Sequence, residues 1–218
     1  MKRIDILNTR LPYAVYLPGR IEAGAKLPCI IFLHGHGESG ANLKYINLYG
    51  IPRYIEDGND LPFIVFAPQC PDDKRWEDLL NEFHRFCVYE ITKYPTDRDR
   101  IYLTGYSMGG QGTWQFVLSN GLFAACAPVA GRIPKHEKYL YRVREIHRKP
   151  IWAFHGTEDE TVPIENSDKI IGILQQVPAP NIRYSRIKGA DHFDICTLVY
   201  YNEDLYTWFL NWTYQPRW

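Results

Sequence analysis

Residues 100–120 read R-I-Y-L-T-G-Y-S-M-G-G-Q-G-T-W-Q-F-V-L-S-N. The apolar run 101–103 predicts a short buried strand, and the composition of 113–118 suits a helix. Between them lies the sequence G-x-S-x-G, with Ser107 at its centre. A serine on such a sharp strand-to-helix turn has strained backbone angles, and the flanking glycines let strand and helix approach closely. The turn therefore predicts an exposed Ser107 hydroxyl, with the N-terminus of the following helix pointing toward it.

The motif alone does not establish a nucleophile. G-x-S-x-G also arises by chance, and a Gly-Ser turn before a helix is ordinary capping chemistry. The interpretation of Ser107 as a nucleophile therefore depends on the rest of the chain.

Length and composition predict a globular protein with one domain over residues 1–218. The chain is 45% hydrophobic and 15% aromatic, which is enough to form a sizeable core. Lys plus Arg and Asp plus Glu both number 25, so the net charge is zero. This balance gives no indication of nucleic acid or an anionic membrane as a partner. A neutral small molecule is the expected ligand, and the sequence does not indicate an oligomeric state.

The cysteines and the N-terminus indicate a cytoplasmic protein. Five cysteines are scattered without C-x-x-C spacing, which is typical of reduced, mostly buried thiols. The first residues, M-K-R-I-D-I-L-N-T-R-L-P, lack the apolar region of a signal peptide, and no run of 18 apolar residues occurs. We expect a cytoplasmic location unless a signal peptide precedes this sequence.

Strand and helix patterns alternate along the chain. Residues 4–17 suggest edge strands, and residues 42–56 suggest a helix with loops, broken at Pro52. Further strands are predicted at 29–33, 63–67, 101–103, 123–130, 151–154 and 182–187, and further helices at 76–94, 113–118, 163–176 and 197–212. This alternation predicts an α/β fold, a mainly parallel twisted sheet with helices on both faces.

Residues 131–149 form a long and strongly basic connection. One interpretation is a short cap over the site. The other, which we favour, is a solvated helix whose Tyr139, Leu140 and Val143 pack on the body of the protein.

A base and an acid for Ser107 are predicted at the ends of two later strands. A serine hydroxyl needs a base, usually His, and the base needs an acid that fixes its tautomer. Asp159 follows the predicted strand 151–154, and His192 follows the strand 182–187. The carboxyl ends of parallel strands meet at one edge of the sheet, where sites are expected. Ser, Asp, His is also the chain order that accompanies this turn.

Alternatives exist for both residues. Asp159 is favoured as the acid, but its place could be taken by Glu158, Glu160 or Asp191. His192 could be a surface histidine with no catalytic part. His155 also ends a strand, but its position inside the turn suggests that it braces the acid loop through hydrogen bonds.

Residues 33–40, L-H-G-H-G-E-S-G, directly follow the first predicted core strand. An oxyanion hole needs backbone N–H groups that no secondary structure consumes, and a glycine-rich turn exposes them. We predict the N–H groups of His36 and Met108 as the donors, with Gly37 as the substitute for His36. His34 is expected to have a structural role. Cys and His do not recur at metal-ligand spacing, so no metal or other cofactor is expected.

Together these stretches resemble the α/β-hydrolase superfamily. The resemblance extends over about residues 28–212 and rests on G-Y-S-M-G-G, H-G-T-E-D-E-T-V-P, G-A-D-H-F-D and L-H-G-H-G-E. With A-P-Q-C-P-D-D-K-R-W at 67–76, the chain is more narrowly similar to a compact esterase group, often labelled predicted peptidase. That group is related to phospholipase/carboxylesterases, dienelactone hydrolase-like proteins and bacterial feruloyl and acetyl-xylan esterases.

The resemblance implies Ser107 as nucleophile, Asp159 as acid, His192 as base, and His36 and Met108 as oxyanion donors. Dienelactone hydrolases have a cysteine nucleophile, and the serine here favours ordinary serine ester chemistry. Trp76 and Gly37 are candidates for the substrate pocket, although packing of Trp76 on its own helix is an equal alternative.

We therefore expect a serine carboxylesterase that acts on small or aromatic acyl esters, with feruloyl and acetyl esters of carbohydrates as candidates. The alternatives are a short-peptide or thioester hydrolase with the same three residues and, more distantly, a binding protein without catalysis on the same fold.

Overall fold

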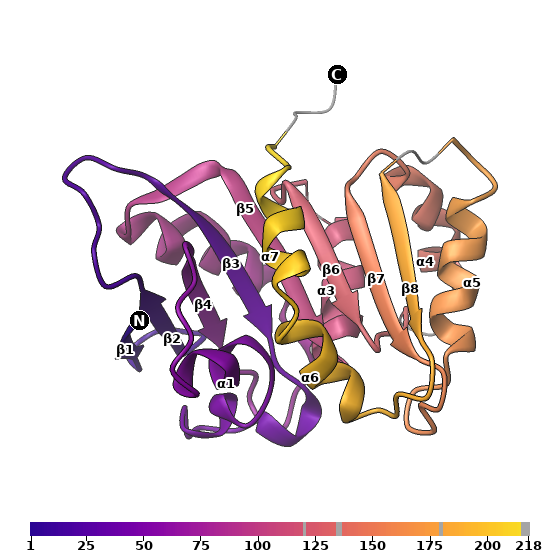
Figure 1. Ribbon diagram of the computed structural model, residues 1–218, viewed down its shortest axis with the longest axis horizontal. Coiled ribbons are helices and arrows are strands. Elements are labelled where there is room, and N and C mark those ends of the chain that lie inside the picture. The colour runs from indigo at the N-terminus through magenta and orange to yellow at the C-terminus, as the bar shows by residue number, and fades with distance from the viewer. Residues whose placement is uncertain (120, 134–136, 179–180, 215–218) are drawn as a thin grey trace.

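A computed structural model describes residues 1–119, 121–133, 137–178 and 181–214. Its centre is an eight-stranded sheet with the order β1-β2-β4-β3-β5-β6-β7-β8 (Figure 1). β1 (Lys2–Ile6) pairs antiparallel with β2 (Tyr13–Leu17), and β2 pairs antiparallel with β4 (Ile64–Pro68). All later pairs are parallel, so the mainly parallel sheet predicted from the sequence is confirmed.

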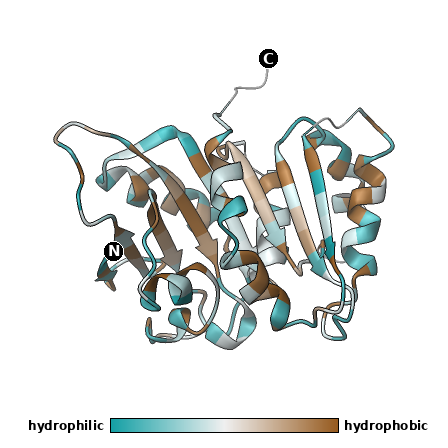
Figure 2. Ribbon diagram, viewed as in Figure 1, coloured by the Kyte–Doolittle hydropathy of each residue, from teal (hydrophilic) through white to brown (hydrophobic). Residues whose placement is uncertain are grey.

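The central strands are largely buried because helices cover both faces of the sheet. These strands are β3 (Leu27–Leu33), β4, β5 (Thr96–Tyr106), β6 (Ala125–Val129) and β7 (Ile151–Gly156). Hydrophobic residues run along β3 and β4, as Figure 2 shows. Strands covered on both faces need apolar side chains in both directions, which explains their continuous apolar runs. β8 (Ile182–Ile187), at the edge, is only partly buried.

Two sets of helices form the outer layers (Figure 1). One face carries α1 (Gly50–Glu56), α6 (Asp194–Tyr200) and α7 (Glu203–Leu210). The other face carries α2 (Leu80–Arg85), α3 (Met108–Ser119), α4 (Glu137–Arg142) and α5 (Glu165–Leu174). A hydrophobic core lies on each side of the sheet. Since β3 to β8 run in parallel, their carboxyl ends and the loops that follow gather on one edge.

Some predicted elements differ from the structure. The predicted break at Pro52 is wrong, because Pro52 lies in the first turn of α1, where a missing N–H disrupts no helical hydrogen bond. Residues 76–93 are helical but irregular, with 3₁₀ segments at each end of the stretch and a π segment at Phe86–Glu90. β5 begins at Thr96, so the charged residues that follow the helix already belong to a strand.

The single helix predicted over 197–212 is two helices in the structure. Asn202 separates α6 from α7, with extended backbone angles of φ −93° and ψ 114°. Its side chain accepts a hydrogen bond from the N–H of Asp204 at 2.9 Å. Asparagine is a preferred N-cap, so the residue begins a new helix where the periodicity alone suggests continuity.

The basic segment 131–149 contains α4 and a 3₁₀ turn at Val143–Ile146. Val143 and Ile146 are buried, and Tyr139 and Leu140 pack partly against the same core. α4 packs against α3, and the 3₁₀ turn packs against both α3 and α5 (Figure 1). The packing alternative is therefore supported for the described part, while residues 134–136, which a cap would include, lie outside the described residues.

Every helix in the described ranges is too short or too polar to span a lipid bilayer.

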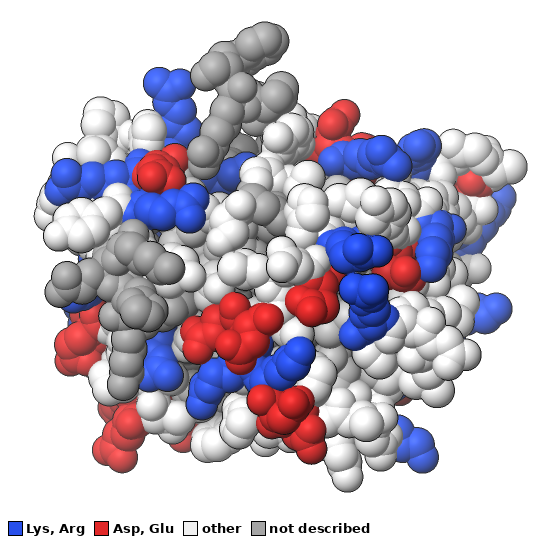
Figure 3. All heavy atoms as spheres, turned by 180° about the vertical axis from the view of Figure 1, so that it is seen from behind, with Lys and Arg blue, Asp and Glu red and all other residues white. Residues whose placement is uncertain are grey.

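On the face shown in Figure 3, basic and acidic side chains are interspersed. All five cysteines are buried free thiols.

Replacing Asn202 with Ala should destabilise the protein by about 1 kcal/mol, because α7 loses its N-cap bond. For a chain of this size, that corresponds to a melting temperature lower by roughly 2–4 °C. Asn202→Asp, which keeps the acceptor, is the matched control. Equal thermal melts of the Ala and Asp variants would contradict the capping role.

Candidate active site

Ser107 lies on a strained turn between β5 and α3. Its φ of 57° is left-handed, a region that non-glycine residues rarely adopt. Its N–H donates to the carbonyl oxygen of Val129 at 2.9 Å, which ties the turn to the end of β6. A Cβ on Gly109 would lie 1.8 Å from the carbonyl oxygen of Leu33, so only glycine permits this approach of α3 to β3. The hydroxyl of the half-buried Ser107 thus faces the edge where the strands end.

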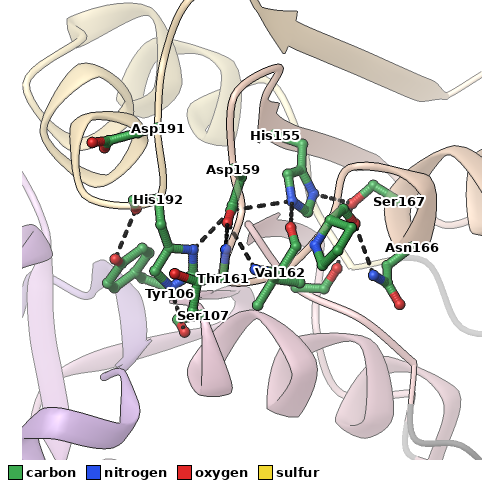
Figure 4. Close-up of polar contacts among 12 residues, drawn as sticks. Tyr106, Ser107, His155, Asp159, Thr161, Val162, Asn166, Ser167, Asp191 and His192 are labelled. Atoms are coloured by element: carbon green, nitrogen blue, oxygen red, sulfur yellow. Dashed lines mark hydrogen bonds and ion pairs between the residues drawn. The ribbon is translucent and has the colours of Figure 1, made fainter.

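His192 and Asp159 complete a hydrogen-bonded row with Ser107 (Figure 4). The Nε2 of His192 lies 2.9 Å from the Oγ of Ser107, and its Nδ1 lies 2.7 Å from Oδ2 of Asp159. Because a carboxylate accepts at Nδ1, Nδ1 carries the proton and Nε2 is left as the acceptor for the serine hydroxyl. The three residues predicted from the chain order therefore meet in the geometry that a serine nucleophile requires.

The environment of Asp159 favours its charged form. Its Oδ1 accepts the N–H groups of Thr161 and Val162 at 3.0 and 2.8 Å. Burial alone would raise the pKa of this carboxyl, but hydrogen bonds from His155, His192 and Val162 outweigh burial and hold the pKa below its ordinary value. A charged Asp159 can stabilise the imidazolium that forms when His192 takes a proton.

His155 stands behind Asp159 in the fully buried interior. Its Nε2 lies 2.7 Å from the carbonyl oxygen of Val162 and 3.3 Å from Oδ2 of Asp159, so this nitrogen is the donor. Its Nδ1 lies 2.6 Å from the hydroxyl of Ser167 on α5. These contacts support the predicted bracing of the acid loop and connect it to α5 (Figure 4).

The other candidate acids do not reach His192. Glu158 and Glu160 are exposed, next to Asp159 on the same loop. Asp191 is also exposed, and its Oδ1 accepts the N–H groups of Phe193 and Asp194 at 2.7 and 2.8 Å. It therefore fixes the turn that leads into α6.

Backbone N–H groups suited to an oxyanion are available on two segments. Met108 is the first residue of α3, so its N–H has no acceptor within the helix. His36 and Gly37 begin a 3₁₀ turn, His36–Glu38, and are exposed. A Cβ on Gly35 would lie 3.4 Å from the ring of Tyr106, so this turn lies beside the Ser107 turn. The predicted donors His36 and Met108, with Gly37 as substitute, thus come from neighbouring segments.

Glu38 holds the His36 turn from inside, a role that the sequence analysis did not identify. The side chain is 1% exposed, and its Oε2 accepts the N–H of Gly35 at 2.9 Å. Burial raises its pKa to about 8, although backbone hydrogen bonds from Gly35 and Tyr49 act in the opposite direction. The position of Glu38 at the end of L-H-G-H-G-E is the sequence signal that could have indicated this role.

His34 and Trp76 support the same turn. The Nε2 of His34 accepts the N–H of Cys70 at 2.9 Å, so its Nδ1 carries the proton and donates to the carbonyl oxygen of Gly35. Burial lowers the pKa of His34 to about 4. The indole of Trp76 donates to the carbonyl oxygen of His34 at 3.0 Å and is fully buried. This burial argues against a place for Trp76 in the pocket wall, since its side chain packs against the ring of His34 and against α3 near Gly112. Gly37 is exposed.

Tyr106, next to Ser107 in the chain, fixes the histidine loop. Its hydroxyl donates to the carbonyl oxygen of His192 at 2.8 Å, and the two rings lie 5.1 Å apart. Sequence reasoning missed this contact because it joins segments 86 residues apart. A separate hollow, lined by residues of 8–11 and 82–93, contains none of the candidate active-site residues.

The chain matches a known protein family. A model described as the dienelactone hydrolase family matches residues 72–192, more than half of the chain. The search among curated proteins gave no significant match.

Solved structures share the fold. A thermostable esterase is 27% identical, with a TM-score of 0.77 over 97% of this chain, which spans only 63% of that esterase. The feruloyl esterase module from Clostridium thermocellum, solved with sinapinate, is 18% identical (TM-score 0.75, covering all of this chain and 90% of the module). An acylaminoacyl peptidase from Pyrococcus horikoshii is also 18% identical (TM-score 0.65, covering 88% of this chain and 37% of the peptidase). The predicted α/β-hydrolase fold is confirmed.

Replacing Glu38 with Gln should make stability less dependent on pH. The folded state binds the Glu38 proton more tightly than the unfolded state, whose pKa lies near 4.5. The stabilisation from this proton is fully present below that pH and is lost as the pH rises through about 8. Between pH 5 and pH 9, the melting temperature of the wild type should therefore fall by several degrees more than that of Glu38→Gln. One kcal/mol corresponds to about 2–4 °C in a chain of this size. Parallel curves would contradict the raised pKa.

Replacing His155 with Gln should lower kcat about 10-fold with little change in KM, because Asp159 loses a partner that orients it. Loss of a residue that orients a functional side chain through a hydrogen bond typically costs a factor of about ten or more. His84→Gln, which changes an exposed histidine on α2, is the matched control. An unchanged kcat in a stably folded His155→Gln protein would show that His155 has no positioning role.

Proposed function

Because the chain belongs to the dienelactone hydrolase family, we propose that it is a serine carboxylesterase with Ser107, His192 and Asp159 as its catalytic residues. The observation that carries the proposal is the continuous row from Oγ of Ser107 through His192 to Asp159, at 2.9 and 2.7 Å. Family membership and the esterases among its structural neighbours support an enzyme that hydrolyses esters.

The reaction proceeds in two steps through an acyl-enzyme. Oγ of Ser107 attacks the ester carbonyl carbon while Nε2 of His192 takes the hydroxyl proton. The N–H groups of His36 and Met108 hold the resulting oxyanion, and Asp159 stabilises the imidazolium. Collapse of the tetrahedral intermediate breaks the bond to the alcohol, which leaves with the proton from His192. Water then attacks the acyl-enzyme by the same route, giving the carboxylic acid and free Ser107.

The proposed substrates are esters of small or aromatic acyl groups, including feruloyl and acetyl esters of carbohydrates. The structural likeness to a feruloyl esterase module is compatible with this choice. A short-peptide or thioester hydrolase with the same residues is the second candidate, favoured by the likeness to an acylaminoacyl peptidase. Competition between ester and peptide substrates would separate the two. We further propose that residues 1–218 act as one domain, with 131–149 as its short additional segment, in the cytoplasm.

Replacing Ser107 with Ala should reduce kcat for p-nitrophenyl esters by a factor on the order of 10⁴ or more, because the nucleophile is lost. A series from acetate to laurate, with methyl ferulate, would give the acyl preference of the wild type. Ser119→Ala, on the same helix with its hydroxyl bound to the carbonyl oxygen of Gln115, is the control. Turnover by Ser107→Ala close to that of the wild type would refute the proposed function.

A further inference from the structure

Aromatic side chains form a row beside His192. The ring of Phe193 lies 5.8 Å from the ring of His192 and 6.3 Å from that of Tyr49. Tyr49 in turn lies 6.2 Å from Tyr106, whose ring is 5.1 Å from His192. Phe193 and Tyr106 therefore flank the histidine that bonds Ser107, and Tyr49 bridges these two rings. None of them is used in the mechanism derived above.

Within this row, the ring of Phe193 is exposed to solvent, whereas that of Tyr49 is partly buried. Phe193 is 58% exposed, although a phenyl ring gains free energy when it is covered. Its backbone is held by Asp191, whose carboxylate accepts the N–H of Phe193 at 2.7 Å. Tyr49 is partly buried and packs against the core on the side of α1, α6 and α7. The held backbone of Phe193 and the packed ring of Tyr49 thus limit the motion of the two rings, which lowers the entropy cost of covering them.

The mechanism determines which part of an ester lies on this side. In the first step, Nε2 of His192 must donate a proton to the departing alcohol oxygen, so that oxygen lies within hydrogen-bond reach of His192. The alcohol portion is therefore the part of the substrate nearest to the histidine loop. Phe193 directly follows His192 in that loop, which places the exposed ring on the alcohol side rather than on the acyl side.

The charges around Phe193 further restrict the ligand. Asp191 and Asp194 lie on either side of it in the chain and are exposed. Carboxylates near the ring disfavour an anionic ligand through like-charge repulsion. An anionic alcohol portion is therefore disfavoured, and an uncharged aromatic one is compatible with both the carboxylates and the exposed ring.

We propose that Tyr49 and Phe193 form a binding site for an uncharged aromatic alcohol portion of the ester substrate. The site would raise kcat/KM for esters of benzyl-type alcohols relative to esters of small alkyl alcohols. This inference rests on the proposed esterase function and adds a preference for the leaving group, independent of the acyl group.

The test compares two acetates that differ only in their alcohol, benzyl acetate and ethyl acetate. In Phe193→Ala, the ratio of kcat/KM for benzyl over ethyl acetate should fall about fivefold, the effect of losing one aromatic contact worth about 1 kcal/mol. Phe193→Leu should lie between the two, and Tyr49→Ala should act in the same direction. Tyr89→Ala, which removes an aromatic residue that is 60% exposed and lines the separate hollow, should leave the ratio unchanged.

An acyl series distinguishes the two sides of the site. The ratio for methyl phenylacetate over methyl acetate should be unaffected by Phe193→Ala. A fall in this ratio with an unchanged benzyl-to-ethyl ratio would place Phe193 on the acyl side and overturn the proposal. So would Ser107-dependent turnover in which neither ratio responds to Phe193→Ala or Phe193→Leu.

A binding measurement makes the site testable even without turnover. Saturation-transfer NMR should detect benzyl alcohol on the wild type and on Ser107→Ala, with a signal lost in Phe193→Ala. If this pattern holds but no ester is hydrolysed, the proposed function fails while the aromatic site stands. If benzyl alcohol gives the same signal in Phe193→Ala as in the wild type, the aromatic site fails.

Discussion

The close contact between the start of α3 and the end of β3 is the constraint on which the rest of the site depends. At Gly109, a Cβ would overlap the carbonyl oxygen of Leu33, and Gly105 is similarly confined by the backbone of Gly109. This contact holds Ser107 in its left-handed conformation and places the free N–H of Met108 beside the His36 turn. The strain of the Ser107 backbone, of order 1–3 kcal/mol, is offset by the packing around it. The start of α3 therefore holds the hydroxyl of Ser107 and the N–H of Met108 close together.

Around this contact, each functional group is held by a second group that takes no direct part in the proposed reaction. His155 and Ser167 connect the loop of Asp159 to α5, and Tyr106 fixes the backbone of His192. Glu38 holds the His36 turn from the interior. Most of these supports are buried, where hydrogen bonds are strong and an unpaired polar group is costly. Such an arrangement keeps donors and acceptors in place before a substrate arrives, which is the basis of electrostatic stabilisation of a transition state.

The parts of this arrangement that local sequence patterns govern could be predicted. The strand 182–187 coincides with β8, and the order Ser107, Asp159, His192 correctly indicated that these residues meet at one edge of the sheet. Their catalytic roles stay predictions. Contacts between distant segments could not be predicted, because no local pattern encodes the bond between Tyr106 and the His192 carbonyl. For the same reason, the indole N–H of Trp76 was not assigned to the carbonyl of His34. The division between α6 and α7 was missed because Asn202 lies within an uninterrupted apolar periodicity.

The central claim is that Ser107 is a nucleophile activated by His192. Labelling with a fluorophosphonate, followed by mass spectrometry of the digested protein, tests it without any assumption about the substrate. Such a reagent reacts with a serine only when a neighbouring base activates the hydroxyl. The account predicts a single adduct on the peptide that contains Ser107, and its loss when His192 is replaced by Ala. Absence of an adduct on the folded protein, or an adduct on a different serine, would contradict the account.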